Sequence, residues 1–213
     1  MLLNKLNRKA VWKISVILIS LLFPVYATSQ EDGRQFTSFS KFNLNVGTLE
    51  DVQSVLGPST LVETGEAGEY EASVCYRLPG GLVYFLSGGM GGRDLTLLGF
   101  GISKLDARKP CAHWPRSVVA PILQIGKLRV GMTVDAFSKI VNGKIEWDGN
   151  NARFFYETKR KFTQEEMSSF NADVQTSIKD GGQQNYFDVQ VALVAKFKNK
   201  RLTEVRVWKI KTL

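Results

Sequence analysis

The chain has 213 residues, of which 44% are hydrophobic and 23% are charged, and its formal net charge is +8. This composition excludes a disordered or collagen-like chain and is ordinary for globular protein. One histidine and two cysteines are too few for a His-rich or Cys-rich metal site, and we predict neither a metal nor a cofactor.

Residues 1–27 have the three parts of a secretory signal peptide. The start carries four basic residues and no acidic residue, and a ten-residue run that is apolar except for two serines follows from Ile14 to Phe23. Small or apolar residues then lead to Ala27, after which we predict cleavage. A retained membrane anchor is the alternative, but a span needs ~20 apolar residues. We therefore predict an exported protein, periplasmic or secreted, with no transmembrane segment after cleavage.

Removal of the signal leaves an uneven distribution of charge. The first half, residues 28–120, carries 8 basic and 10 acidic residues, whereas the second half, residues 121–213, carries 16 basic and 10 acidic residues. A basic segment can indicate nucleic-acid binding, but an exported protein rarely meets nucleic acid, and we predict no such partner. The excess is explained either by a solvated lysine-rich face or by contact with an anionic envelope surface or an acidic protein.

An internal repeat relates the two halves. Gly47-Thr48 and Gly131-Met132-Thr133 each precede four apolar residues at positions i, i+3, i+6 and i+7, which lie on one face of a short helix. The threonines are expected to cap helices that end at Gly57-Pro58 and at Asn142-Gly143. A period of about 85 residues is too long for a solenoid and indicates a duplicated small domain.

Strands with alternating apolar residues follow each expected helix. The expected strands are 72–78, 82–86, 95–102, 152–158, 187–197 and 202–211, with a tight turn at Asn199-Lys200 before the last one. We therefore predict an α+β fold of two tandem repeats, 28–120 and 121–213. Each repeat has a short helical N-terminal part packed on a three- to four-stranded antiparallel sheet.

The second repeat contains an inserted helix, which we expect over residues 163–180. Thr163 and Glu166 have the spacing of a capping box, and an apolar stripe follows at Met167, Phe170, Val174 and Ile178. The stripe is expected to dock either on the edge of the sheet or on a partner.

The glycine and threonine opening, the short capped helix and the antiparallel sheet resemble a known pattern. The residues that carry the resemblance are Gly131, Met132, Thr133 and Phe137 in the second repeat and Gly47, Val52, Leu56, Gly57 and Pro58 in the first. They are similar to the SmpA/OmlA (BamE) family of small outer-membrane-assembly lipoproteins and to the β-lactamase inhibitor proteins (BLIP-like), which pair two such units. The chain lacks the lipidated cysteine of the former and an identifiable inhibitory loop of the latter. The resemblance implies a binding protein without catalysis.

Cys75 and Cys111 are the two cysteines, and in an oxidising compartment we predict that they form a disulfide. The alternative is a thiol nucleophile activated by His113. Cys111 and His113 are only two residues apart, which is a poor geometry for a catalytic dyad. We therefore identify no catalytic residue.

The last hairpin carries the candidate binding surface. If Val205 and Val207 face the core, Arg206 and Trp208 face outward, and the further candidates are Gln190, Lys196 and Lys209. Tryptophan and arginine beside apolar neighbours are typical of a protein-binding hot spot. The alternative is that the other half or the inserted helix covers this face.

These features predict a non-catalytic binding protein of the bacterial cell envelope type that recognises a protein partner through its sheet. An inhibitor of a secreted hydrolase is the alternative, and an enzyme that uses the Cys-His pair is a third.

Overall fold

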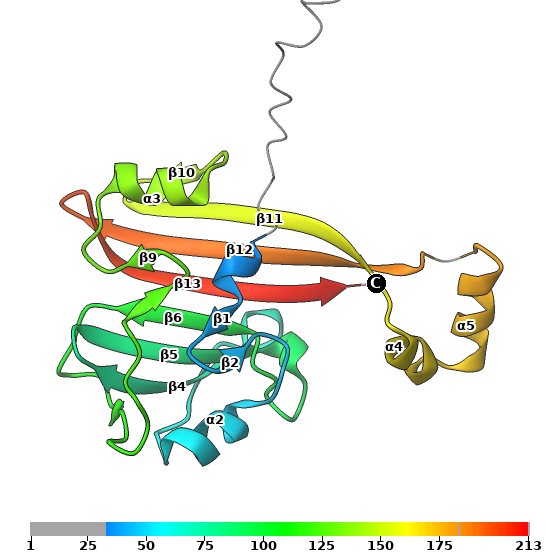
Figure 1. Ribbon diagram of the computed structural model, residues 1–213, viewed down its shortest axis with the longest axis horizontal. Helices are drawn as coiled ribbons and strands as arrows, with labels where there is room; N and C mark the ends of the chain where they lie inside the picture. The colour runs from blue at the N-terminus through cyan, green and yellow to red at the C-terminus, as the bar shows by residue number, and fades with distance from the viewer. Residues whose placement is uncertain (1–32, 183, 213) are drawn as a thin grey trace, which may run out of the picture. The chain divides into compact units, whose positions relative to one another are not determined.

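In the described part of the chain, pairing of neighbouring strands joins both halves into one sheet of nine strands (Figure 1). The computed structural model describes residues 33–182 and 184–212, so the predicted signal peptide over residues 1–27 lies outside the described residues. Among the described helices, none combines the length and the apolar character that a membrane span requires.

Each half contributes a run of consecutive strands. The order across the sheet is β10-β11-β12-β13-β6-β5-β4-β3, with β7 beside β4. β6 and β13 pair antiparallel at the junction of the halves, with Phe100 opposite Val207. The strands are β3 (Val62–Thr64), β4 (Glu71–Leu78), β5 (Gly81–Gly88), β6 (Gly99–Ser103), β7 (Ala112–His113), β10 (Glu146–Asp148), β11 (Asn151–Lys161), β12 (Tyr186–Lys198) and β13 (Arg201–Thr212).

Both short helices that the repeat predicts are present, as α2 (Leu49–Leu56) and α3 (Val134–Val141). The hydroxyl of Thr48 accepts a hydrogen bond from the backbone of Asp51, and Thr133 caps α3 in the same way. The helices end at Gly57 and Asn142, both with positive φ. The predicted α+β class, with mostly antiparallel strands and few helices, is confirmed.

A tyrosine from the sheet holds the C-terminal end of each helix. The hydroxyl of Tyr76 donates to the carbonyl of Gly57, and that of Tyr156 donates to the carbonyl of Val141, each at 2.7 Å. The strand registers place Tyr76 and Tyr156 on the same face of the sheet. Both helices therefore cover this face, which we call the helix face, and we call the opposite one the open face. Burial raises the pKa of Tyr76 to about 12.

One hydrophobic core lies on the helix face and spans both halves. It contains Phe85 and Phe100 from the first half and Leu193 and Val205 from the second, all fully buried. The inward alternation predicted for the last hairpin is confirmed, since the odd-numbered residues from Val189 to Phe197 are buried. The described residues of both halves thus share this main core, and a separate small cluster contains Cys75, Leu82 and Cys111.

Short elements that the sequence analysis did not predict complete the fold. They are β1 (Ser38–Phe39), β2 (Phe42–Asn43), β8 (Gln124–Ile125), β9 (Leu128–Arg129) and the 3-10 turns at Arg34–Phe36, Ala67–Glu69 and Gly89–Gly91. The strand expected from residue 95 begins only at Gly99, because Leu95 has a φ of 52° and cannot continue a strand.

The insertion in the second half forms two helices, so the prediction of one helix over 163–180 is wrong. α4 (Gln164–Ser169) and α5 (Ala172–Lys179) are separated at Phe170, whose backbone is extended, and Asn171 caps α5 through the backbone N–H of Val174. The ring of Phe170 contacts those of Phe162 and Phe187. The apolar stripe therefore docks, through Phe170, on the ends of the neighbouring strands β11 and β12.

Glu166 joins the insertion to the sheet. Its carboxylate completes the predicted capping box with Thr163 and lies 2.6 Å from a guanidinium nitrogen of Arg160 and 3.5 Å from the ammonium of Lys211. The hydrogen bond from Arg160, together with the backbone of Thr163 and the charge of Lys211, outweighs burial and lowers the pKa of Glu166 to about 2.

Acid should loosen α4 before it unfolds the sheet. The folded pKa of Glu166 lies below its ordinary value, so its contribution is complete above about pH 5 and is lost as the pH falls toward 2. After screening by solvent we expect a loss of about 1 kcal/mol. Hydrogen exchange of α4 amides, corrected for intrinsic rates, should reveal this step. Glu166→Gln should abolish it, whereas Glu165→Gln should retain it. An unchanged step in Glu166→Gln would contradict the assignment.

Candidate functional site

The centre of the open face is built around two glycines of β6. Gly99 and Gly101 pair with Trp208 and Arg206 of β13 and present no side chain between β5 and β13. A Cβ at Gly99 would lie 2.8 Å from the carbonyl oxygen of Val207 and 3.0 Å from the indole of Trp208. The indole therefore lies directly on the backbone of β6, and its far edge reaches Gly88 of β5. Only glycine permits this close approach.

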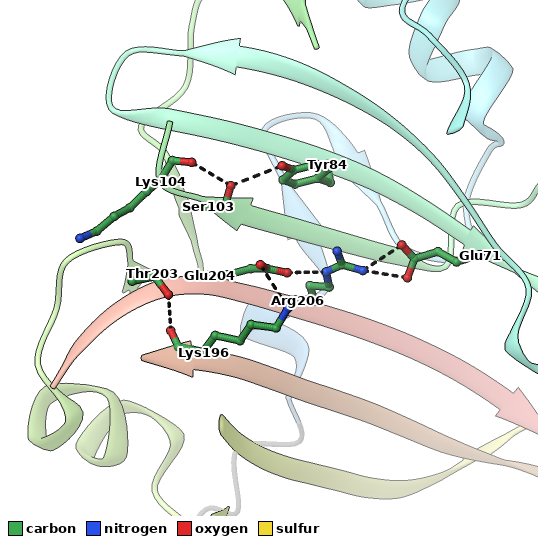
Figure 2. A network of polar contacts seen from close by, with 8 residues as sticks. All are labelled: Glu71, Tyr84, Ser103, Lys104, Lys196, Thr203, Glu204 and Arg206. Atoms are coloured by element: carbon green, nitrogen blue, oxygen red, sulfur yellow. Dashed lines mark hydrogen bonds and ion pairs between the residues drawn. The ribbon is translucent and has the colours of Figure 1, made fainter. Parts of the chain in front are cut away.

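An ion-pair network beside this tryptophan connects the two halves (Figure 2). The guanidinium of Arg206 lies 2.8 Å from both carboxylate oxygens of Glu71 in β4 and 2.7 Å from Glu204 in β13. Lys196 of β12 lies 3.5 Å from Glu204. Burial opposes the charge of Arg206, but Glu71 and Glu204 outweigh it and raise the pKa of the guanidinium above its ordinary value. Arg206 is thus fixed in place while its side chain stays 30% exposed.

A row of apolar residues crosses the open face in register with Trp208. Phe155 of β11 pairs with Ala192 of β12, which pairs with Trp208. Phe155 is 43% exposed, and Ile210 and Trp208 are partly exposed. The open face therefore presents an aromatic and aliphatic strip beside a fixed arginine, an arrangement typical of a protein interface.

The structure places four of the five predicted surface residues on the open face. Arg206, Trp208, Gln190 and Lys196 share it, and the amide of Gln190 donates to Glu157 at 3.0 Å. Lys209 lies on the helix face, where it borders a small pocket with Val191, so its assignment to this surface is corrected. The reason is the alternation of β13, because adjacent residues of a strand point to opposite faces.

Neither the other half nor the insertion, the two candidate covers of this face, buries the strip in the described structure. The described residues of the first half extend the sheet sideways through the pairing of β6 with β13 and leave Trp208 partly exposed. The insertion docks through Phe170 at the ends of β11 and β12. Sequence reasoning missed Phe155 and Glu71. The adjacent pair Phe154-Phe155 was an available signal, since one of two neighbours in a strand must face outward.

The predicted disulfide between Cys75 and Cys111 is present. It fixes the loop of residues 104–111 over one end of the open face, where Leu82 packs against both cysteines. Arg77 donates to four carbonyl groups of this loop. His113 is exposed in β7, and in the disulfide neither sulfur is a thiol that it could activate. Among the described residues, no group of three potential ligands could hold a metal ion.

Comparison with known proteins adds little to this description. The sequence matches no protein-family model and has no significant match among curated proteins. A solved structure from Streptococcus mutans, described as a "putative beta-lactamase inhibitor protein", aligns with 78% of this chain and 82% of its own at 9% identity and a TM-score of 0.23. At this TM-score the similarity carries no argument about fold or function.

A double-mutant cycle should measure the link between the halves. One guanidinium nitrogen of Arg206 contacts both carboxylate oxygens of Glu71, and the pair is partly shielded from water. We therefore expect a coupling free energy of about 1–2 kcal/mol between Arg206→Met and Glu71→Gln in chemical unfolding. The exposed pair Lys159 and Asp188, whose charged atoms lie 4.0 Å apart, serves as control and should show no measurable coupling. Equal values for the two cycles would refute the proposed link.

Proposed function

We propose that this chain is an exported, non-catalytic binding protein that recognises a protein partner through the open face of its sheet. The observation that carries the proposal is the asymmetry of the two faces. α2 and α3 both cover the helix face, while the open face keeps Phe155, Trp208 and Arg206 accessible.

The arrangement of these residues suits tight association. Tryptophan and arginine near the centre of a buried patch are the residue types that most often dominate binding energy. Here the Gly99 backbone holds the indole and Glu71 and Glu204 hold the guanidinium. Little side-chain freedom remains to be lost when a partner binds, which favours affinity.

The proposal includes tandem repeats of the SmpA/OmlA or β-lactamase-inhibitor type. The supporting observations are the threonine cap at the start of α2 and of α3, the tyrosine at the end of each helix, and the antiparallel strands that follow each helix. Inhibition of a secreted hydrolase would be one form of such binding. Identification of the partner would show whether the chain acts as an inhibitor.

The proposed location is the periplasm or the exterior of the cell. The signal-like residues 1–27 and the disulfide both support it, because structural disulfides persist in oxidising compartments. The basic second half is compatible with an anionic envelope surface nearby. The proposal assigns no catalytic role to the cysteines, since they are joined to one another, and it includes no metal or cofactor.

Photo-crosslinking in cells of the source organism tests this proposal. Phe155 is replaced by p-benzoylphenylalanine, and Lys139, exposed on α3, is replaced in the same way as a control. We expect a protein adduct from position 155 and not from position 139. Trp208→Ala should reduce the adduct at least tenfold because a central tryptophan contributes about 2 kcal/mol or more.

Trp147→Ala is the matched tryptophan control. Trp147 is 45% exposed but contacts Phe197 on the helix side of the sheet, so the adduct should persist. Circular dichroism verifies that each variant is folded. An adduct from position 139 alone, or one insensitive to Trp208→Ala in a folded protein, would overturn the proposal.

A further inference from the structure

A groove with a volume of about 940 Å³ lies beside the turn between β4 and β5. Its floor is apolar and recessed, with Leu78 5% and Trp114 8% exposed. Its rim carries two aliphatic side chains that project into solvent, Leu105 at 60% and Val119 at 90% exposure. Exposed aliphatic residues around a recessed apolar floor mark an interaction site.

The groove is also positively charged. None of its lining residues is acidic, and the lining includes Arg77 and Arg116. Lys104, Arg108 and Lys109 lie in the adjoining loop, where Asp106 is the only carboxylate and pairs with Arg108. A partner segment that carries carboxylates is the electrostatic complement of this surface.

Covalent and hydrogen bonds shape the groove before a ligand arrives. The disulfide and the four carbonyl contacts of Arg77 hold the loop that carries Leu105. The indole N–H of Trp114 donates to the carbonyl of Val118 at 3.0 Å and holds the segment before Val119. A preformed site loses little conformational freedom on binding.

We propose that this groove binds an extended segment of a partner protein in which acidic and aliphatic side chains alternate. Aliphatic side chains would enter the recessed floor, and carboxylates would face Arg116 of the lining and Lys104 and Lys109 of the adjoining loop. β7, which borders the groove, pairs only with β4 among the described strands and leaves an edge suited to an added extended segment. The recessed floor favours a peptide side chain over a flat lipid surface.

This inference does not depend on the open face. The groove shares no residue with the strip formed by Phe155, Trp208 and Arg206, and the two are tested with different variants. The proposal for one surface can therefore be refuted without affecting the proposal for the other.

Fluorescence anisotropy with a defined peptide tests the groove. The probe is fluorescein-labelled Glu-Leu-Glu-Leu-Glu-Leu-Glu, titrated with the full chain under non-reducing conditions. Saturable binding that weakens with added salt is expected. Val119→Asp and Arg116→Glu should each lower the affinity at least tenfold and leave the fold intact. The matched controls Val46→Asp, at a site 66% exposed, and Lys144→Glu should leave the affinity unchanged.

Two further peptides test whether the acidic and the aliphatic side chains are both required. The peptides with lysine in place of glutamate and with serine in place of leucine should bind at least tenfold more weakly. The proposal is overturned if the Glu-Leu peptide shows no saturable binding. It is also overturned if this peptide binds no more tightly than the lysine peptide, or if Val119→Asp leaves its affinity unchanged. Vesicles of phosphatidylserine and phosphatidylcholine that bind through Val119 while the peptide does not would assign the groove to a lipid surface instead.

Discussion

The antiparallel pairing of β6 with β13 is the interaction on which the rest of the structure depends. It joins residues 99–103 of the first half to residues 204–208 of the second and turns two runs of strands into one sheet. The same pairing sets Gly99 and Gly101 beside Trp208 and Arg206. A side chain at Gly99 would meet both the backbone of Val207 and the indole, so the close packing of the open face requires glycine at this place.

Different interactions lie on the two faces of this sheet. On the helix face, residues of both halves form one core that α2 and α3 close. On the open face, an ion pair between Glu71 of β4 and Arg206 of β13 joins these two strands across β5 and β6, which lie between them. The disulfide and Arg77 then fix a loop at the end of this face. Most of the apolar burial lies on the helix face, and the open face is the one that we propose for recognition.

Local patterns were sufficient to predict much of this fold. The threonine caps, the glycine and asparagine helix ends and the period of two in the last hairpin each have a local physical cause, and the structure contains all of them. The pairing of β13 with β6 has no such local cause, because its partners are separated by about one hundred residues and only the final packing selects them. The ion pair between Arg206 and Glu71 depends on that pairing and was therefore not predictable from the sequence.

The errors also have physical reasons. The apolar stripe of the insertion keeps a helical period across Phe170. The side chain of Asn171 nevertheless caps a new helix, so the segment forms two helices instead of one. Lys209 was grouped with Trp208 by proximity in sequence, although neighbours in a strand face opposite ways. Conversely, Trp208 was expected on the surface and is there, but its indole also packs on Gly99.

The pairing of β6 with β13 should make one cooperative unit of both halves. Hydrogen exchange followed by mass spectrometry, on the natural chain and on Cys75→Ser/Cys111→Ser, tests it most directly. The disulfide lies wholly within the first half, and its loss should cost about 3–4 kcal/mol. If the sheet opens as one unit, protection should fall equally in β4 and β5 and in β12 and β13. A loss confined to β4 and β5, with β12 and β13 unchanged, would contradict the account.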